Sequence, residues 1–378
     1  LRSCIYFANA NGGADTIQFG ISNMRIDLLS ALPALTDPSG VTIDASGQKV
    51  IVSGHNLINE DGFKILSPFN TIKDLAIIRF RADAFNPYSA AGIRISGLNA
   101  HDNRIIGCRV GTDYQDKTGF NNSIGINQSV ISGNDHTSSG HGIYIDGGKH
   151  TIITKSYIGI KSNGTELLEN YGSGIYITDF PSMENIIGGS TASNLGNVIS
   201  GNNAHGIFID NSHNNKIYGN IIGLNASGDS VLANKNDGVR IVNGSTSNQV
   251  GNTSLSNRNI ISGNGWSGVH IEDPGTSDTV VMNNYLGLNA AGTAKAANKK
   301  AGVTIRDSAG NYVGVDSVGN TGGNTISGNG TFGIMLYGSD ARNNLIKNNT
   351  IGLNTLLDPA GNAQGGILII NFAYSNRK

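Results

Sequence analysis

The side chains of this chain that could do acid–base or ligand-binding chemistry gather around one short pattern. The pattern is Gly-[Ile/Val]-x-[Ile/Leu], and its glycines are Gly92, Gly142, Gly174, Gly206, Gly238, Gly268, Gly302, Gly333 and Gly366. Side chains alternate between the two faces of a strand, so x and the residue after the pattern face away from the two branched residues. If successive copies lie side by side, these outward residues form columns on one surface.

Three columns follow from this alignment. The x column contains Arg94, Tyr144, Tyr176, Phe208, Arg240, His270, Thr304, Met335 and Leu368. The next outward column contains Asp146, Thr178, Asp210, Val242, Glu272, Arg306 and Tyr337. Directly before the glycines stand His141, Ser173, His205, Asp237, Ser267, Ala301 and Phe332. The columns predict an aromatic strip, formed by Tyr144, Tyr176 and Phe208, beside a patch of charged and imidazole groups.

This surface suits an extended polysaccharide. Aromatic rings pack against the apolar faces of sugar rings, and arginine binds carboxylates through two parallel hydrogen bonds. The predicted substrate-binding residues are Tyr144, Tyr176, Phe208, His205, Asp237 and Arg306. The alternative is purely structural, because exposed strand positions favour aromatic residues and opposite charges on neighbouring strands form cross-strand pairs. In that case the protein is a rigid shaft or adhesin.

The same patch contains candidates for catalysis on a uronic acid. A lyase or epimerase needs a base beside the carbon next to the carboxylate, and a cation to stabilise the developing charge. Arg240 or Arg306 with His270 could supply these groups. Asp210 or Glu272 would orient the base.

A glycoside hydrolase would instead need two carboxylates at a defined separation. The candidate pairs on this surface are Asp210 with Asp237, and Glu272 with Asp273. Whether the protein is an enzyme stays open at this stage. We expect no metal or other cofactor, and calcium binding near Asp113, Asp116 and Asn225 has no supporting motif.

Composition narrows the possible partners. The 378 residues carry a formal net charge of -1, and 14 % are charged, which argues against a nucleic-acid or anionic-membrane binder. No apolar run approaches the ~18 residues of a membrane span. Disorder is disfavoured because 38 % of the residues are hydrophobic. The two cysteines, Cys4 and Cys108, are expected to be unpaired, with Cys108 a small core residue.

The elements that carry the columns must be short strands. From Gly142 onward the pattern returns at intervals of roughly 32 residues, the size of one supersecondary unit. Each unit contains three short stretches of period two, punctuated by Gly and Asn at the corners. Two phrases, Ile-Ser-Gly-Asn and Ile-Gly-Leu-Asn, alternate between the copies and indicate two alternating coil types. The sequence therefore predicts an all-β, right-handed parallel β-helix with three strands per coil.

The ends and corners of this solenoid have their own signals. Residues 1–14 are predicted to form an N-terminal cap with a short helix over 1–11, and 15–378 one β-helical domain that continues beyond the C-terminus or is sealed there by a partner. Stacked amides are expected where Ile-Ser-Gly-Asn recurs, at Asn134, Asn202, Asn264 and Asn329. Longer loops at 162–173, 225–237 and 289–301 would support the glycan groove if they flank the aromatic strip, and count against it if they lie on another sheet.

The first residues also resemble a known family. Leu1-Arg2-Ser3-Cys4-Ile5, followed by Ala8-Asn9-Ala10-Asn11 and Gly13-Ala14-Asp15-Thr16-Ile17, resembles the start of bacterial surface proteins with a CSLREA motif. Ser3-Cys4 and Gly12 stand where that family has Glu-Ala and Pro. The Asn/Gly-rich coils look like the pectate-lyase-like superfamily. This resemblance implies a secreted or cell-surface β-helix, in a superfamily that includes lyases, hydrolases, epimerases, tailspikes and inert shafts.

Overall fold

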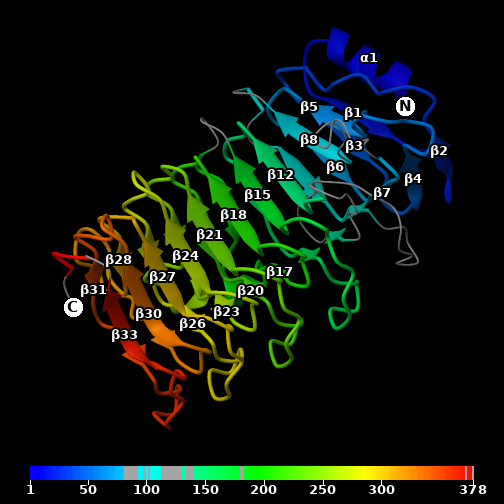
Figure 1. The fold of residues 1–378 in the computed structure, drawn as a ribbon. Coiled ribbons are helices and arrows are strands. Elements are labelled where there is room, and N and C mark those ends of the chain that lie inside the picture. Colours follow the sequence, from blue (N-terminus) through cyan, green and yellow to red (C-terminus); the bar gives the residue numbers. More distant parts are fainter. Residues whose placement is uncertain are drawn as a thin grey trace.

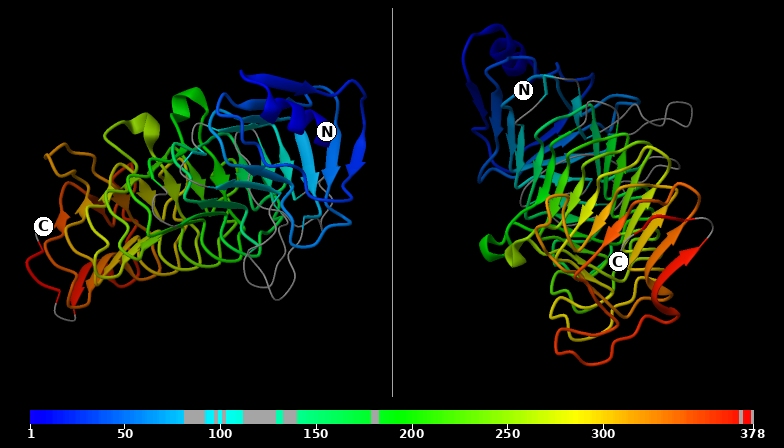
Figure 2. Two further views of the ribbon diagram at one scale, coloured as in Figure 1. Left: turned by 90° about the horizontal axis from the view of Figure 1, so that it is seen from above. Right: turned by 90° about the vertical axis from the view of Figure 1, so that its left-hand side faces the viewer.

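The chain is a parallel β-helix, as predicted. The structure is a computed structural model that describes residues 1–80, 92–96, 99–100, 103–111, 129–132, 140–178, 183–370 and 373–376. Its strands pair only in parallel and make three long faces around one core (Figure 1). The two ends of the chain lie at opposite ends of the solenoid (Figure 2).

Successive strands visit the three faces in turn. Face I contains β5 (Phe63–Ile65), β8 (Ile93–Ser96), β12 (Ile143–Asp146), β15 (Ile175–Thr178), β18 (Ile207–Asp210), β21 (Val239–Val242), β24 (Val269–Glu272), β27 (Val303–Arg306), β30 (Phe332–Tyr337) and β33 (Gly365–Ile370).

Face II consists of two sheets that take the same place in the winding. The first contains β1 (Asp15–Gln18), β3 (Val41–Asp44), β6 (Thr71–Lys73) and β9 (Arg104–Ile106). The second contains β13 (Ile152–Ile153), β16 (Ile186–Gly188), β19 (Lys216–Tyr218), β22 (Gln249–Val250), β25 (Val280–Val281), β28 (Tyr312–Val313) and β31 (Leu345–Ile346).

Face III runs almost the full length of the solenoid. It contains β2 (Arg25–Asp27), β4 (Val50–Ser53), β7 (Leu75–Ile78), β10 (Arg109–Val110), β11 (Val130–Ile131), β14 (Tyr157–Ile158), β17 (Val198–Ile199), β20 (Ile221–Ile222), β23 (Ile260–Ile261), β26 (Tyr285–Leu286), β29 (Thr325–Ile326) and β32 (Thr350–Ile351). From β14 onward the Ile-Gly and Ile-Ser-Gly-Asn phrases alternate along this face, which confirms the two coil types.

The inward residues of every strand form one continuous apolar core. Ile175, Ile207 and Val239 are fully buried neighbours in face I. Burial of each such side chain stabilises the fold by about 1.5–3 kcal/mol relative to exposure. At the N-terminal end α1 (Arg2–Ala10) buries Ile5 and Ala8 against this core, which confirms the capping helix.

Buried asparagines form three ladders, one at each corner. Before face I, Asn202 Nδ2 donates to Asn234 Oδ1 at 2.8 Å, and Asn234 donates to Asn264 at 2.9 Å. The predicted members Asn202, Asn264 and Asn329 are therefore confirmed, and Asn134 lies outside the described residues. The prediction missed the alternate members because they end the long loops and follow another phrase. Similar ladders precede faces II and III.

The long loops lean over face III. Their hairpins close at the pairs Ile160–Leu167, Leu224–Val231 and Leu288–Lys295. Leu224 and Leu288 are fully buried in a small cluster with Ile260 and Tyr285, both on the outer side of face III. The tips of these loops are thus not placed over the aromatic strip of face I, which counts against the predicted glycan groove on that strip.

The two cysteines are free and lie in different environments. Cys4 is exposed, whereas Cys108 is fully buried. Burial raises the pKa of the Cys108 thiol to about 12, so it stays protonated and inert at neutral pH.

Candidate functional site

The strand register confirms the outward columns of face I. Tyr144, Tyr176 and Phe208 are partners on consecutive strands, and Phe208 is followed by Arg240 and then His270. In the second column, Glu272 pairs with Arg306. Because the isoleucines and valines of each strand must point into the core, the alternate side chains must point outward. Figure 1 shows β12 to β33 side by side in this order.

Asp237 lies at the centre of a buried charged cluster. Its side chain is fully buried, and its Oδ2 lies 3.3 Å from His270 Nδ1 and 3.6 Å from Arg240 Nη1. His205 Nδ1 lies 3.4 Å from the same oxygen and 3.3 Å from the Asp237 backbone nitrogen. The backbone N–H of Ser267 donates to Asp237 Oδ1 at 2.9 Å. This single carboxylate therefore orients three side chains from three consecutive coils.

Glu272 forms the outer half of the cluster. It accepts hydrogen bonds from Arg240 and from Arg306, the latter at 2.6 Å from Nη1 to Oε1. Its Oε2 lies 3.7 Å from His270 Nε2. The Arg306 side chain is 48 % exposed, so part of its guanidinium remains open to solvent.

The surroundings set the charge of these groups. Burial by itself raises the pKa of Asp237, but its interactions with His205 and His270 hold it well below its usual range. Burial lowers the pKa of His205, although Asp237 opposes this shift. At neutral pH Asp237 is ionised and His205 is neutral.

A pocket of about 330 Å³ opens beside this cluster. It is lined by Asp237, Arg240, Trp266, Ser267, His270, Glu272, Lys300, Thr304, Arg306, Met335 and Tyr337. We call it the charged pocket. Five of the predicted site residues line it: Asp237, Arg240, His270, Glu272 and Arg306. The sixth member of the cluster, His205, does not line the pocket but contacts Asp237, which does.

Two of its residues lie outside the predicted columns. Trp266 and Lys300 stand two positions before the glycines of β24 and β27, one residue outside the columns considered. The Lys300 ammonium lies 4.3 Å from the centre of the Trp266 ring, within the range of a cation–π contact. Extending the alignment by one position, and noting that Trp266 is the one tryptophan of the chain, would have found both.

The rings of the aromatic strip pack against one another. Tyr176 and Phe208 stack almost in parallel, with ring centres 4.9 Å apart and planes 10° apart. Tyr144 and His141 pack against Tyr176 with ring centres at 5.3 Å and 4.8 Å. Each ring covers part of its neighbour's face, which stabilises the sheet and leaves less ring surface for a sugar.

Asp210 belongs to this strip and not to the charged pocket. It accepts a hydrogen bond from Tyr176 Oη at 2.8 Å and another from Asn243 Nδ2 at 2.8 Å. Burial, followed by hydrogen bonding and the charge of Asp210, raises the pKa of Tyr176. Asp210 lies two strands from His270, and nothing brings the two together.

The proposed hydrolase pairs are also separated by their contacts. Asp237 is held by two histidines and Glu272 by two arginines. Asp273 turns away from the cluster and accepts from the backbone N–H of Asn243 at 3.2 Å. The geometry gives neither pair two open carboxylates across a shared space.

Metal ligands do not gather here. Within the described ranges, no three His, Cys, Asp or Glu side chains come close enough to hold a metal ion. Asn225 bonds to Asp229 and Ser230 within its own turn. Asp113 and Asp116 lie outside the described residues. In the part of the chain that the structure describes, no helix is long and apolar enough to cross a membrane.

A comparison with solved structures found proteins that align over most of this chain. A periplasmic alginate epimerase, AlgG, aligns over 94 % of this chain and 84 % of its own, with 13 % identity and a TM-score of 0.48. The A-module of the mannuronan C-5 epimerase AlgE4 from Azotobacter vinelandii aligns over 99 % and 93 %, with 13 % identity and a TM-score of 0.44. No protein-family description and no curated protein matches the sequence. At such identities shared chemistry is not implied.

Proposed function

We propose that face I binds an extended, carboxylate-bearing polysaccharide at the charged pocket. The observation that carries this proposal is a group of three cations that lines one pocket, in a chain with net charge -1. Arg240, Arg306 and Lys300 line the pocket with two carboxylates, Asp237 and Glu272. Both carboxylates are already engaged within the protein, so an incoming anion meets the unused N–H groups of the cations.

The shape of face I supports a long ligand rather than a small one. The pocket spans several neighbouring strands, and the outward columns continue on both sides of it. Trp266 is 37 % exposed at its rim and offers an amphipathic ring to a sugar. With such a partner, we expect the protein to be secreted or to lie at the cell surface.

A binding assay with matched polymers tests this proposal. Polygalacturonate and polymannuronate should bind, and a neutral glucan of equal length should not. Arg306→Ala should weaken binding at least about tenfold, because a hydrogen bond to a charged group is lost. Lys216→Ala serves as the control because Lys216 is an exposed cation on face II. Failure of every acidic polymer to bind the folded protein would favour the structural shaft.

A second candidate function is catalysis by His270. Its Nδ1 faces the buried Asp237, while its Nε2 is buried and has no hydrogen-bond partner among the described residues. An imidazole oriented in this way can accept the proton from the carbon next to a substrate carboxylate, while Arg306 stabilises the resulting enolate. Loss of the neighbouring glycosidic oxygen then completes a lyase reaction, and return of a proton to the opposite face completes an epimerisation.

Two product assays distinguish these outcomes from binding alone. Unsaturated uronates absorb in the ultraviolet and report a lyase. Exchange of the ring proton for deuterium, followed by nuclear magnetic resonance, reports an epimerase. His270→Gln should abolish either signal and leave polymer binding within about threefold. Binding without either product would reject catalysis and leave the binding function intact.

A further inference from the structure

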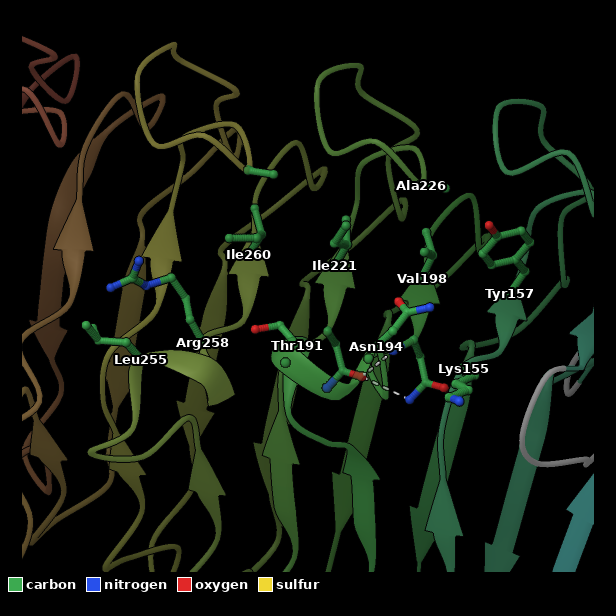
Figure 3. Close-up of a pocket in the computed structure, with 15 residues that line it drawn as sticks. Lys155, Tyr157, Thr191, Asn194, Val198, Ile221, Ala226, Leu255, Arg258 and Ile260 are labelled. Atoms are coloured by element: carbon green, nitrogen blue, oxygen red, sulfur yellow. Dashed lines mark hydrogen bonds between the residues drawn. The ribbon is translucent and has the colours of Figure 1, made fainter.

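A second groove crosses face III, on a different side of the solenoid from the charged pocket. It encloses about 510 Å³ between the long loops and two short 3₁₀ turns, η1 (Thr191–Ser193) and η2 (Leu255–Asn257). Figure 3 shows Val198, Ile221 and Ile260 in a row across successive strands, with the loops on one side of them and the turns on the other. Neither the sequence columns nor the proposed function uses this groove.

The floor of the face III groove is regular and apolar. Tyr157, Val198, Ile221 and Ile260 occupy the same outward position of β14, β17, β20 and β23, and the strand register pairs each with the next. Four strands at this spacing extend about 14 Å along the solenoid. A ligand in the groove therefore meets the same aliphatic surface at each step, together with one tyrosine ring at the end.

The walls are held in place before any ligand arrives. On one side, Ala226 N donates to Gly164 O at 2.9 Å and Ala290 N to Gly228 O at 2.8 Å, so each hairpin tip rests on the previous one. On the other side, Thr191 Oγ1 donates to Ser256 O at 2.9 Å and ties η1 to η2. Such preorganisation lowers the entropic cost of binding.

The charges of the groove are all positive. Its charged lining residues are Lys155 and Arg258, with no Asp or Glu among the lining. Arg258 is held rigidly, with its guanidinium 4.0 Å from the centre of the Tyr285 ring and Nη1 donating to Tyr285 Oη at 2.6 Å. Lys155 has no side-chain partner among the described residues. This distribution selects an anionic ligand.

Backbone pairing favours a polysaccharide over an acidic peptide. A peptide gains affinity on a sheet mainly by adding a strand to a free edge. The floor strands β17, β20 and β23 are paired on both sides, so no edge is free. The groove instead offers an aliphatic floor for C–H faces and amide and hydroxyl groups, such as Asn194 and Thr191, for ligand hydroxyls.

We propose that the face III groove binds one strand of an acidic polysaccharide, as a second site independent of the charged pocket. The protein then holds two polymer strands on two faces, or two parts of one strand. Lys155 and Arg258 bind the carboxylates, and the row from Tyr157 to Ile260 carries the sugar rings.

Calorimetric titration of the whole chain with an oligouronate tests this second site. The wild type should bind two oligomers. Lys155→Glu and Arg258→Gln should each weaken one of the two sites at least about tenfold and leave the other unchanged. Lys216→Glu provides a matched charge reversal outside both sites, and thermal unfolding verifies that each variant is folded. Lys155→Glu keeps the test valid even if Arg258→Gln fails to fold.

The outcomes separate this inference from the proposed function. One oligomer bound, lost in Arg306→Ala and unchanged in Lys155→Glu, would overturn the second site and leave the charged pocket intact. One oligomer bound, lost in Lys155→Glu and unchanged in Arg306→Ala, would support the face III groove and reject the charged pocket as a binding site. Equal binding of polyglutamate at the face III groove would overturn the assignment to polysaccharide.

Discussion

The aromatic strip and the charged pocket occupy the same positions of the same repeated strand, yet their side chains make different kinds of contact. In β12, β15 and β18 the outward rings stack on one another, and Tyr176 satisfies Asp210. In β21 and β24 the outward Arg240 and His270 contact Asp237, and Arg240 and His270 line the charged pocket together with Arg306 of β27. The repeat therefore determines the position of a side chain on the sheet. The neighbouring side chains on adjacent coils determine whether that side chain can still bind a ligand.

The largest effect that separates the two regions is expected at Asp237. Asp237→Ala should lower the free energy of unfolding by about 3–5 kcal/mol, because it leaves buried polar and charged partners without their acceptor. Chemical denaturation measures this change. Glu169→Ala, at an exposed acidic position, is the control and should stay within about 0.5 kcal/mol of the wild type. A small loss at Asp237 would mean that the cluster is not a structural unit.

A second comparison tests whether both regions rest on the same scaffold. Asn202→Ala below the strip and Asn264→Ala below the pocket should each cost about 2 kcal/mol, because each leaves ladder amides unsatisfied. The free energy of unfolding should change equally in the two variants. A clear difference between the two losses would show that the asparagine ladder contributes unequally to stability beside the strip and beside the pocket.

The pH dependence of stability should report the burial of His141 beside the strip. Burial lowers the pKa of His141 to about 4 from its usual 6.5, so the unfolded state takes up this proton first as the pH falls. The free energy of unfolding is therefore unaffected by His141 above pH 6.5. Between pH 6.5 and about 4 it falls by no more than about 1.4 kcal/mol per pH unit because of this group. His141→Gln should flatten the unfolding free energy in this window, and an unchanged slope would assign the titration to another group.

The smallest effect is expected at Tyr176. Tyr176→Phe removes the hydrogen bond to Asp210 and should cost about 1 kcal/mol of unfolding free energy, with polymer affinity nearly unchanged. Tyr176→Ala tests the ring itself by the same titration. An affinity loss equal to that of Arg306→Ala would show that the strip is part of the binding site after all.

Much of the architecture could be predicted because the repeat is strict. Each copy of the pattern has a glycine followed by branched residues at two alternate positions. Only one winding of the chain buries these branched residues in every copy. The open N-terminal end of such a solenoid needs a cover, which predicts the capping helix. The asparagine ladder was predicted only at alternate coils, since the other members stand in loops of variable length. Trp266 and Lys300 were missed for a related reason, because they lie just outside the regular strand.

The sequence by itself determined the fold, the outward columns and the identity of the groups in them. Periodicity does this because a side chain's face depends only on its place in the strand. Tertiary structure alone decided that Asp237 orients two histidines, that Asp210 is occupied by Tyr176, and that the long loops flank face III. Those outcomes depend on distances between coils and on the lean of irregular loops, which a one-dimensional pattern does not encode.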